Sequence, residues 1–443
     1  MPFQLKNRTV FSSIFLIAIV ALCVQGCKKE TNKAEEVKLY WFIPDGMRAD
    51  PELFNIYEWA EQGDLPNIKK MMDRGTYGYS IPVFPGHTPV NFATLLTGST
   101  PKVHGVADGP MHVEGRPLDK VAVGGFSSTA KKVPPIWVTL EENGRKVAVI
   151  STPGSTPPEI DNGLVVRGRW GGWGADFHAI NFESKENNTQ RVKQGRSSRL
   201  FFFGPELTKY IDPSPASGWQ NIPASFSPPL EASMESWGAA VYAYIFDATD
   251  DDIQNYDSIT FSYDKKTILE TLKQGEWGGW HPLFLKWQNL DVPSHARFHV
   301  IILDNDGFFR IRLFYNNLNK FITQPEGAAE EFNLNVGPMM DFVDNFPPQL
   351  IYYPEDRKTF LEEQSMTFDW HTKSISFIKK RYQPDAVIHD IYNPNQMLTS
   401  RWWMGYIDPK SARYNAISET ERAKRWQEVK GMYKDLDAMI GEI

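Results

Sequence analysis

The sequence predicts an α/β protein in which a parallel sheet, covered by helices on both faces, carries a β-rich insertion. Apolar strand-like runs alternate with amphipathic helix patterns at both ends of the chain, whereas the middle is rich in Pro, Gly, aromatics and short alternating runs. The length of 443 residues allows two or three folding units. A composition of 41% hydrophobic and 23% charged residues excludes a disordered chain and a polytopic membrane protein, and the net charge of −7 argues against a broad nucleic-acid-binding surface.

The N-terminal segment has the features of an export signal and not of a folded domain. Basic residues precede an apolar run over 11–24 that is short for a bilayer span, and the small residue before Cys27 resembles a bacterial lipoprotein cleavage box. We expect a signal peptide over 1–26, a lipidated Cys27 and a polar tether over 27–36; an uncleaved anchor is the alternative. The protein is then a cell-envelope lipoprotein, facing the periplasm or the outer surface, that meets the membrane only through its lipid.

The first third of the chain alternates between strands and helices. Each predicted helix shows apolar residues at three- and four-residue spacing or a Pro near its start, and a Gly follows its last residue. Thr88 is a capping residue type in front of the second helix. The predicted elements are a buried strand over 37–43, helices over 65–74, 89–97 and 134–143, and a second strand over 147–151.

The middle of the chain, 204–353, is expected to form the β-rich insertion or cap. Alternating runs over 297–303 and 308–315 flank an Asp-Asn-Asp-Gly sequence, which predicts a hairpin. We therefore assign 37–203 and 354–443 to the α/β core.

The α/β pattern resumes after the insertion, with a helix over 360–381 and a strand over 386–391. The last segment gives the clearest helix signal, because Ser418 and Glu421 form a capping box ahead of an apolar stripe. In a layered α/β fold such a helix normally leads back to a sheet strand, but Ile443 is the last residue. We therefore expect the C-terminal part of the core to be missing.

Polar residues with catalytic potential follow the first strand and open the second helix. Asp45 comes directly after the strand, at the sheet edge where α/β folds place ligands. Thr88 stands at a helix N-terminus, where free N–H groups and the dipole favour an anion such as phosphate. Asn91, one turn on, is positioned to direct its amide at the same oxyanion. Each feature alone is also compatible with a plain turn or an empty helix cap.

Taken together, these residues resemble the type I phosphodiesterase/nucleotide pyrophosphatase family of the alkaline phosphatase superfamily. The motifs are Asp-Gly-x-Arg at 45–48, Phe-Pro-x-x-Thr-x-x-Asn at 84–91 and Leu-Leu-Thr-Gly-x-x-Pro-x-x-His-Gly-Val at 95–106. The resemblance covers about 37–175 and 355–443, and it implies an alkaline-phosphatase-like core. The middle matches only in general character, including Gly-Glu-Trp-Gly-Gly-Trp at 275–280.

The resemblance implies a metal-dependent hydrolase of phosphate mono- or diesters. In this family two metal ions, usually zinc, lie at the sheet edge, and Asp45 and Thr88 match ligands of one of them. Thr88 also matches the nucleophile, which gives a phospho-threonine intermediate, and Asn91 matches a residue that stabilises the phosphoryl oxygens. The expected partner is a phosphate-ester small molecule of nucleotide type, and not a nucleic-acid polymer.

The second metal site of the family has weak counterparts here. Its Asp and His, four residues apart after a strand, correspond to Asn395 and Thr399, whose amide and hydroxyl oxygens bind zinc far more weakly. His389 and Asp390 are alternative ligands, although a hydrogen-bonded core histidine is the simpler expectation. The late Asp-His-Gly element and the final His ligand of the family have no counterpart in the sequence. Zinc occupancy is therefore expected to be partial at most.

Other functions stay open at this level. A catalytically inactive truncated relative, or an envelope binding module that uses the aromatic-rich insertion, is the main alternative. A sulfatase would share the fold, but the sequence around Thr88 does not fit the Cys/Ser-x-Pro-x-Arg context of that branch. The sequence contains no Gly-x-Ser-x-Gly elbow, which disfavours a serine hydrolase, and no Walker loop for binding phosphate. We expect His87 to touch substrate or to hold its loop, and His104 to be a turn residue.

Overall fold

The computed structural model describes residues 38–112, 114–117, 123–166, 179–185, 208–287, 290–316, 318–320, 322–340, 351 and 354–443. The expected signal peptide, the tether and Cys27 lie outside the described residues. The chain divides into two units, Met1–Leu39 and Tyr40–Ile443, and the second contains all the described helices. Among these helices, none has the length and apolar character that crossing a membrane requires.

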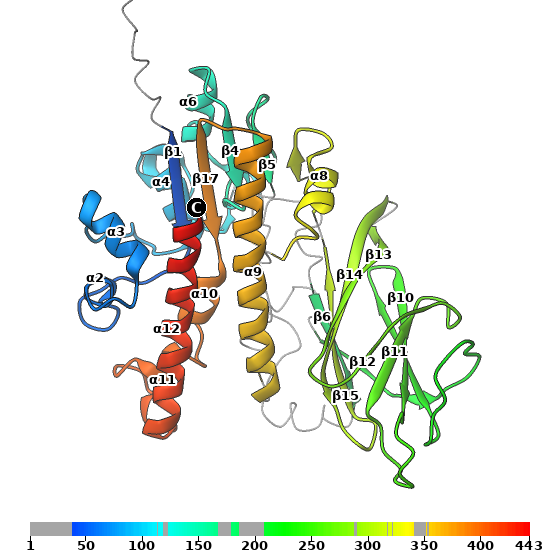
Figure 1. Ribbon diagram of the computed structural model, residues 1–443. Helices are drawn as coiled ribbons and strands as arrows, with labels where there is room; N and C mark the ends of the chain where they lie inside the picture. The colour runs from blue at the N-terminus through cyan, green and yellow to red at the C-terminus, as the bar shows by residue number, and fades with distance from the viewer. Residues whose placement is uncertain are drawn as a thin grey trace, which may run out of the picture. The chain divides into compact units, whose positions relative to one another are not determined.

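A five-stranded sheet with the order β1-β17-β4-β5-β16 forms the α/β part (Figure 1). β17 (Ala386–Ile391) pairs in parallel with β4 (Val147–Ile150), and β4 pairs in parallel with β5 (Leu164–Val166). These pairs confirm the predicted parallel arrangement. β16 (Thr323–Gln324) adds an antiparallel strand at one edge, next to β5, and β1 (Leu39–Pro44) lies beside β17 at the other. The sheet is therefore mixed, and not parallel throughout.

Helices cover both faces of this sheet, as predicted. Successive residues of a strand point to opposite faces. The odd-numbered residues of β4 pack in one apolar cluster with α4 (Thr88–Thr97) and α6 (Ile136–Glu142). The even-numbered residues pack in another cluster with α8 (Ala328–Asn335) and α9 (Pro354–Arg381). α9 begins six residues before the predicted helix start at 360.

The C-terminal helix, α12 (Glu419–Glu442), begins at the predicted capping position. The Ser418 hydroxyl accepts a hydrogen bond from the Glu421 N–H at 3.2 Å. α12 packs against α9 and α3 (Pro66–Arg74), and its Tyr433 hydroxyl donates to the Arg48 carbonyl at 2.8 Å. The short elements nearby are α2 (Ile56–Glu61), α5 (Pro101–His104), α10 (Asn393–Leu398), α11 (Met404–Ile407), two 3₁₀ turns (Ser128–Ala130 and Tyr414–Ala416) and the ribbon of β2 (Pro110–Met111) and β3 (Val123–Gly124).

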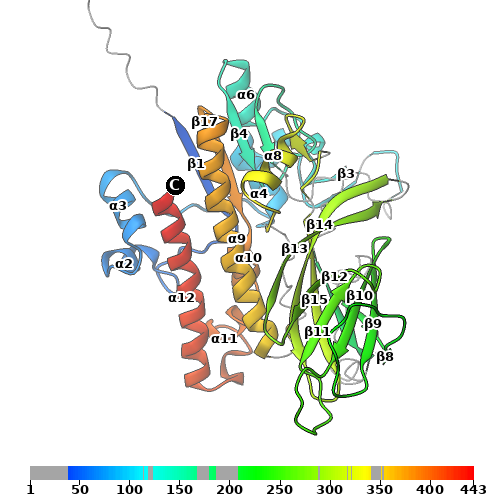
Figure 2. The same ribbon diagram turned by 45° about the vertical axis from the view of Figure 1, so that its right-hand side comes forward.

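Two further five-stranded sheets form a β-sandwich (Figure 2). One contains β12 (Ile268–Leu272), β11 (Ser258–Ser262), β10 (Ala239–Phe246), β9 (Leu230–Ser236) and β8 (Ser214–Pro215). The other contains β13 (Trp277–Trp287), β14 (Leu290–Leu303), β15 (Phe309–Tyr315), β6 (Ala179–Ser184) and β7 (Thr208–Ile211). The sheets share an apolar core, in which Phe261 and Phe298 stack with ring centroids 4.3 Å apart. The predicted hairpin joins β14 to β15.

The chain moves between the sheets at residues other than the expected boundaries at 203/204 and 353/354. β6 precedes residue 204, yet it pairs with β15 in the sandwich. β16 and α8 precede residue 353, yet they join the core sheet and its covering layer. Short strands such as these carry little periodic signal, so only their partners reveal the sheet to which they belong.

Candidate functional site

The loop after β1 and the helix after β17 meet at the carboxyl ends of these strands. The Asp45 N–H donates to the Ile391 carbonyl at 2.9 Å, and the Asp45 side chain is buried. Gly46 has a φ of 71°, and a Cβ on it would lie 2.5 Å from the Asn395 Cα, so only glycine fits here. The structure thus brings Asp45 and Asn395 together from opposite ends of the chain.

Thr399 lies directly beside Asn395. Its hydroxyl donates to the Asn395 carbonyl at 2.7 Å and lies 3.4 Å from the Asn395 Oδ1. These predicted residues therefore offer one carboxylate, one amide and one hydroxyl, whereas zinc prefers imidazole, thiolate and carboxylate ligands. Among the residues that the structure describes, no group of three or more His, Cys, Asp or Glu side chains is placed to hold a metal. This donor set does not fit a two-zinc centre.

α4 presents Thr88 at its first turn. His87, which has extended backbone angles, is the N-cap residue, so the expectation that Thr88 is the cap is wrong by one position. Thr88 is half-buried and is the first residue of the helix. Phe92 and Leu96 fix α4 on the sheet, in a cluster against which Ile43 of β1 also packs. Thr88 and Asp45 therefore belong to neighbouring elements.

The Asn91 side chain forms hydrogen bonds with the backbone of the loop over 83–87, which leads into α4. Its Oδ1 accepts from the Val83 N–H at 2.8 Å, and its Nδ2 donates to the carbonyls of Pro85 and His87 at 3.2 and 2.9 Å. Both ends of the amide are thus engaged with the backbone. In this conformation Asn91 positions the loop, and the predicted contact with a phosphoryl oxygen requires an exchange of these bonds.

His87 is joined to a residue that no motif of the sequence singles out. Its Nδ1 forms a short hydrogen bond with the Asp108 carboxylate, which also accepts from the Gly109 N–H at 2.7 Å. These two bonds hold the pKa of Asp108 below its usual value. Both side chains are exposed. The two residues are separated by α4 and α5, so no local spacing pattern pointed to Asp108.

His104 and His389 make hydrogen bonds within the fold. This agrees with the expectation of a structural role for His104 and of a hydrogen-bonded core histidine at 389. His104 is buried, its Nε2 lies 3.1 Å from the Thr94 hydroxyl, and burial lowers its pKa. The two ring nitrogens of His389 form hydrogen bonds of 2.8 Å with the Tyr40 hydroxyl and with the His371 Nδ1. Because both nitrogens are engaged in the core, His389 is not positioned as a metal ligand. Asp390 is fully buried in the same strand.

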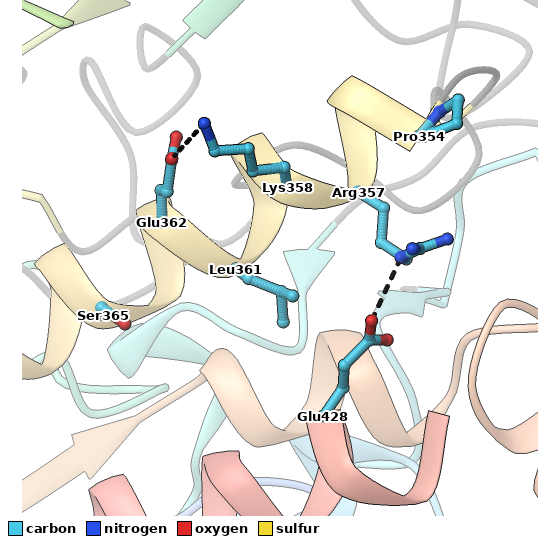
Figure 3. A pocket seen from close by; sticks show the side chains of 7 residues that line it. All are labelled: Pro354, Arg357, Lys358, Leu361, Glu362, Ser365 and Glu428. Atoms are coloured by element: carbon cyan, nitrogen blue, oxygen red, sulfur yellow. Dashed lines mark ion pairs between the residues drawn. The ribbon is translucent and has the colours of Figure 1, made fainter. Parts of the chain in front are cut away.

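A pocket of about 370 Å³ lies between the first half of α9 and α12 (Figure 3). One ion pair, Arg357–Glu428 at 3.2 Å, joins the two helices, and a second, Lys358–Glu362 at 3.5 Å, lies along α9. The lining residues include none of the predicted site residues, and their charges are paired with one another. The pocket therefore presents no reactive group, and the sheet edge near Asp45 is the better candidate site.

Comparison with known proteins agrees with the motifs at this edge. The profile of the family described as type I phosphodiesterase / nucleotide pyrophosphatase matches residues 40–263. Human ectonucleotide pyrophosphatase/phosphodiesterase family member 1 is 33% identical over 123 residues, or 26% of this chain and 12% of the human protein. Venom phosphodiesterase 2 of Crotalus adamanteus is 33% identical over 129 residues, or 27% of this chain and 15% of the venom protein. The chain thus matches only a small part of each relative, and no solved structure matches it.

Proposed function

Because the chain belongs to the type I phosphodiesterase/nucleotide pyrophosphatase family, we propose that it hydrolyses phosphate mono- or diesters through Thr88. The observation that carries the proposal is the start of α4. Thr88 opens a helix of ten residues on the sheet face beside β1, within the matched residues. The names of the relatives point to nucleotide-type phosphodiesters as substrates.

In the proposed reaction the Thr88 Oγ attacks phosphorus, and a P–O bond to the enzyme forms as the P–O bond to the leaving group breaks. The Thr88 proton passes to solvent, and the leaving oxygen takes a proton from solvent. Water then cleaves the phospho-threonine and restores the hydroxyl. The N-terminal N–H groups and dipole of α4 stabilise the negative charge on the phosphoryl group. Asn91 fixes the loop that carries this helix start.

Members of this family are metal-dependent, and zinc is the ion that the resemblance suggests. Asp45 with Thr88 gives at most part of a zinc site, and Asn395 and Thr399 do not complete it. We therefore propose a hydrolase with low zinc content and impaired turnover. We also propose an alkaline-phosphatase-like core, and a lipoprotein anchored to the cell envelope through Cys27, on the strength of the sequence motifs.

A second candidate is a relative without catalytic activity that acts as an envelope binding module. The observation in its favour is the neutral hydrogen-bonded pair of Asn395 and Thr399 at the expected metal position. A carboxylate and an imidazole at this position would hold a cation, whereas here the Thr399 hydroxyl donates to the Asn395 backbone carbonyl.

The experiment that separates the candidates is hydrolysis of bis-p-nitrophenyl phosphate by the purified chain, together with its zinc content. The variant T88A is expected to lose turnover and to change the free energy of unfolding by less than about 0.5 kcal/mol, because Thr88 is not the cap residue. T97A, which alters a threonine at the other end of α4, is the control and is expected to keep turnover.

Turnover that survives in T88A would rule out the nucleophile. A wild-type chain with neither zinc nor turnover would favour the binding module. Full zinc occupancy would show that the assessment of Asn395 and Thr399 is wrong.

A further inference from the structure

The loop between α3 and α4 carries the most exposed apolar side chains of the described chain. Phe84 is 94% exposed and Ile81 is 89% exposed, more than any other large hydrophobic residue that the structure describes. Tyr77 and Tyr79, on the same loop, are also exposed. Single exposed apolar residues are common in soluble proteins, whereas four on one segment mark a surface that binds a partner. We call residues 77–84 the apolar loop.

Contacts at both ends keep the apolar loop in this exposed conformation. The Tyr57 ring of α2 packs against Tyr77 and Tyr79, with ring centroids 4.8 and 5.4 Å apart. The Tyr57 hydroxyl also donates a short hydrogen bond to a carbonyl of the loop. At the other end, the Asn91 amide holds the backbone on either side of Phe84. The exposed side chains are therefore presented by a fixed loop, and folding them back onto the protein would break these contacts.

The charge pattern around the apolar loop favours a lipid surface as the partner. Residues 75–101 contain no Asp, Glu, Lys or Arg, although charged residues make up 23% of the chain. Arg74 and Lys102 bound this uncharged stretch, and both are exposed. Tyrosine is enriched at membrane–water interfaces, apolar side chains enter the headgroup region, and flanking cations are attracted to anionic lipids. An uncharged apolar segment between two cations therefore suits the surface of a bilayer, where a buried charge is costly.

The proposed lipid anchor holds the apolar loop within reach of such a surface. The chain from Cys27 to Tyr40, where the folded unit begins, extends to at most about 45 Å. A tether of this length lets the folded unit present more than one face to the bilayer. A second contact is therefore needed to fix its orientation, and one lipid-anchored site combined with a second membrane signal gives more stable attachment than either alone.

We propose that the apolar loop docks on the headgroup region of the lipid bilayer, with Ile81 and Phe84 inserted among the headgroups. Arg74 and Lys102 then lie close to anionic lipids. The anchor holds the chain at the membrane, and the loop fixes which face of the folded unit meets it. This contact brings the start of α4, and with it Thr88, next to the membrane surface. The proposal uses the proposed anchor, but it does not depend on the phosphoesterase activity.

The test is labelling of the full, membrane-anchored chain by a photoactivatable phospholipid in vesicles of phosphatidylcholine and phosphatidylglycerol. Trypsin cleaves after Arg74 and Lys102, so the apolar loop is recovered in the peptide 75–102. Peptide 274–286, which contains the exposed Phe284 of the β-sandwich, is the internal control. We expect at least about fivefold more lipid label in 75–102 than in 274–286, because only the loop enters the headgroup region.

Substitutions in the apolar loop make the test specific. I81S/F84S is expected to lower the label in 75–102 to the level of the control peptide. It is expected to leave thermal unfolding unchanged, because both side chains are exposed. The matched control F284S/L334S removes two exposed apolar side chains elsewhere and is expected to keep the label in 75–102.

Three results would overturn the proposal, and they differ in what they leave standing. Equal label in the two peptides, or label in 75–102 that persists in I81S/F84S, would leave the anchor without a docking loop. A chain that stays in solution, with no label in any peptide, would remove the anchor as well. An unlabelled peptide 75–102, together with a dimer of the wild type that I81S/F84S abolishes, would assign the loop to a second copy of the chain.

Discussion

The interface between the β-sandwich and α9 uses polar residues differently from the sheet edge near Asp45. At the interface, two arginines of β15 and three carboxylates are buried almost completely, and each arginine contacts a carboxylate: Arg310 pairs with Glu183 and Asp356, and Arg312 pairs with Glu363. At the sheet edge the groups are mostly neutral and closer to solvent: Asn395 is half-buried and Thr399 is exposed.

The contrast indicates that the buried charges of the interface stabilise the fold, whereas the polar residues of the sheet edge remain accessible to a substrate. A buried charge that lost its partner would stay unpaired in a medium of low polarity, whereas a half-exposed amide regains hydrogen bonds from water. Substitutions in the interface network should therefore act mainly on stability, and substitutions near Thr88 should act mainly on turnover. Changes at Arg312, Glu363, Gly46 and Asn91 test this division, in order from the largest expected effect on stability to the smallest.

Removal of Arg312 is expected to have the largest effect. Arg312 binds Glu363 through its Nε and Nη2 and also donates to the Asn181 Oδ1 at 3.0 Å, so R312M leaves a buried carboxylate without its cation. We expect a loss of about 3–5 kcal/mol in the free energy of unfolding, measured by urea denaturation. R312M/E363M is expected to recover part of this loss. K410M breaks an exposed pair with Glu52 and serves as the control with little change.

The pH dependence of stability should report on Glu363. Burial raises its pKa from 4.5 to about 7, against the opposing effect of Arg312, with further contributions from Glu362 and Arg297. The folded state therefore binds the proton more tightly, so the stabilisation is full below about pH 4.5 and is lost as the pH rises to about 7. Relative to E363Q, the wild type should lose up to about 3 kcal/mol over this range in urea titrations. Parallel curves would mean that Glu363 is ionised throughout.

Gly46 tests the contact that brings the two predicted segments together. G46A places a methyl group against Asn395 and adds backbone strain, because φ is 71°. The matched control is G63A, which has a φ of 89° and no neighbour within 4 Å, so it carries the strain alone. We expect about 1–2 kcal/mol of destabilisation for G63A and at least about 1 kcal/mol more for G46A. Equal thermal shifts would mean that the loop moves away from Asn395 at no cost.

Asn91 should show the smallest effect on stability and a clear effect on turnover. N91A removes the hydrogen bonds to Val83, Pro85 and His87, but these groups lie near solvent, so we expect a loss of about 1 kcal/mol. A loosened loop should lower kcat for the phosphodiester more than it changes KM. N143A, which removes an exposed bond to Thr139, is the control. An unchanged kcat in N91A would show that the conformation of this loop does not affect the reaction.

Local sequence features predicted most of the core helices and strands and indicated the family. Apolar spacing or an early Pro, with a Gly after the last helical residue, predicted α3 and α4. The Asp-Asn-Asp-Gly turn predicted the β14–β15 hairpin, and the capping box predicted the start of α12. These features depend on residues only a few positions apart, whose conformational preferences act without the rest of the fold. The motifs around Asp45 and Thr88 indicated the family in the same local way.

The residues that come together from distant parts of the chain could not be predicted from local patterns. The alternation in β15 is typical of a strand with Arg310 and Arg312 facing solvent, yet α9 covers that face and buries both. The contact of Gly46 with Asn395, the link from His87 to Asp108 and the convergence of Glu270 with His281 likewise join segments that no local spacing relates. Such contacts arise from how the layers pack, because burial and charge pairing are properties of the assembled chain and not of any one segment.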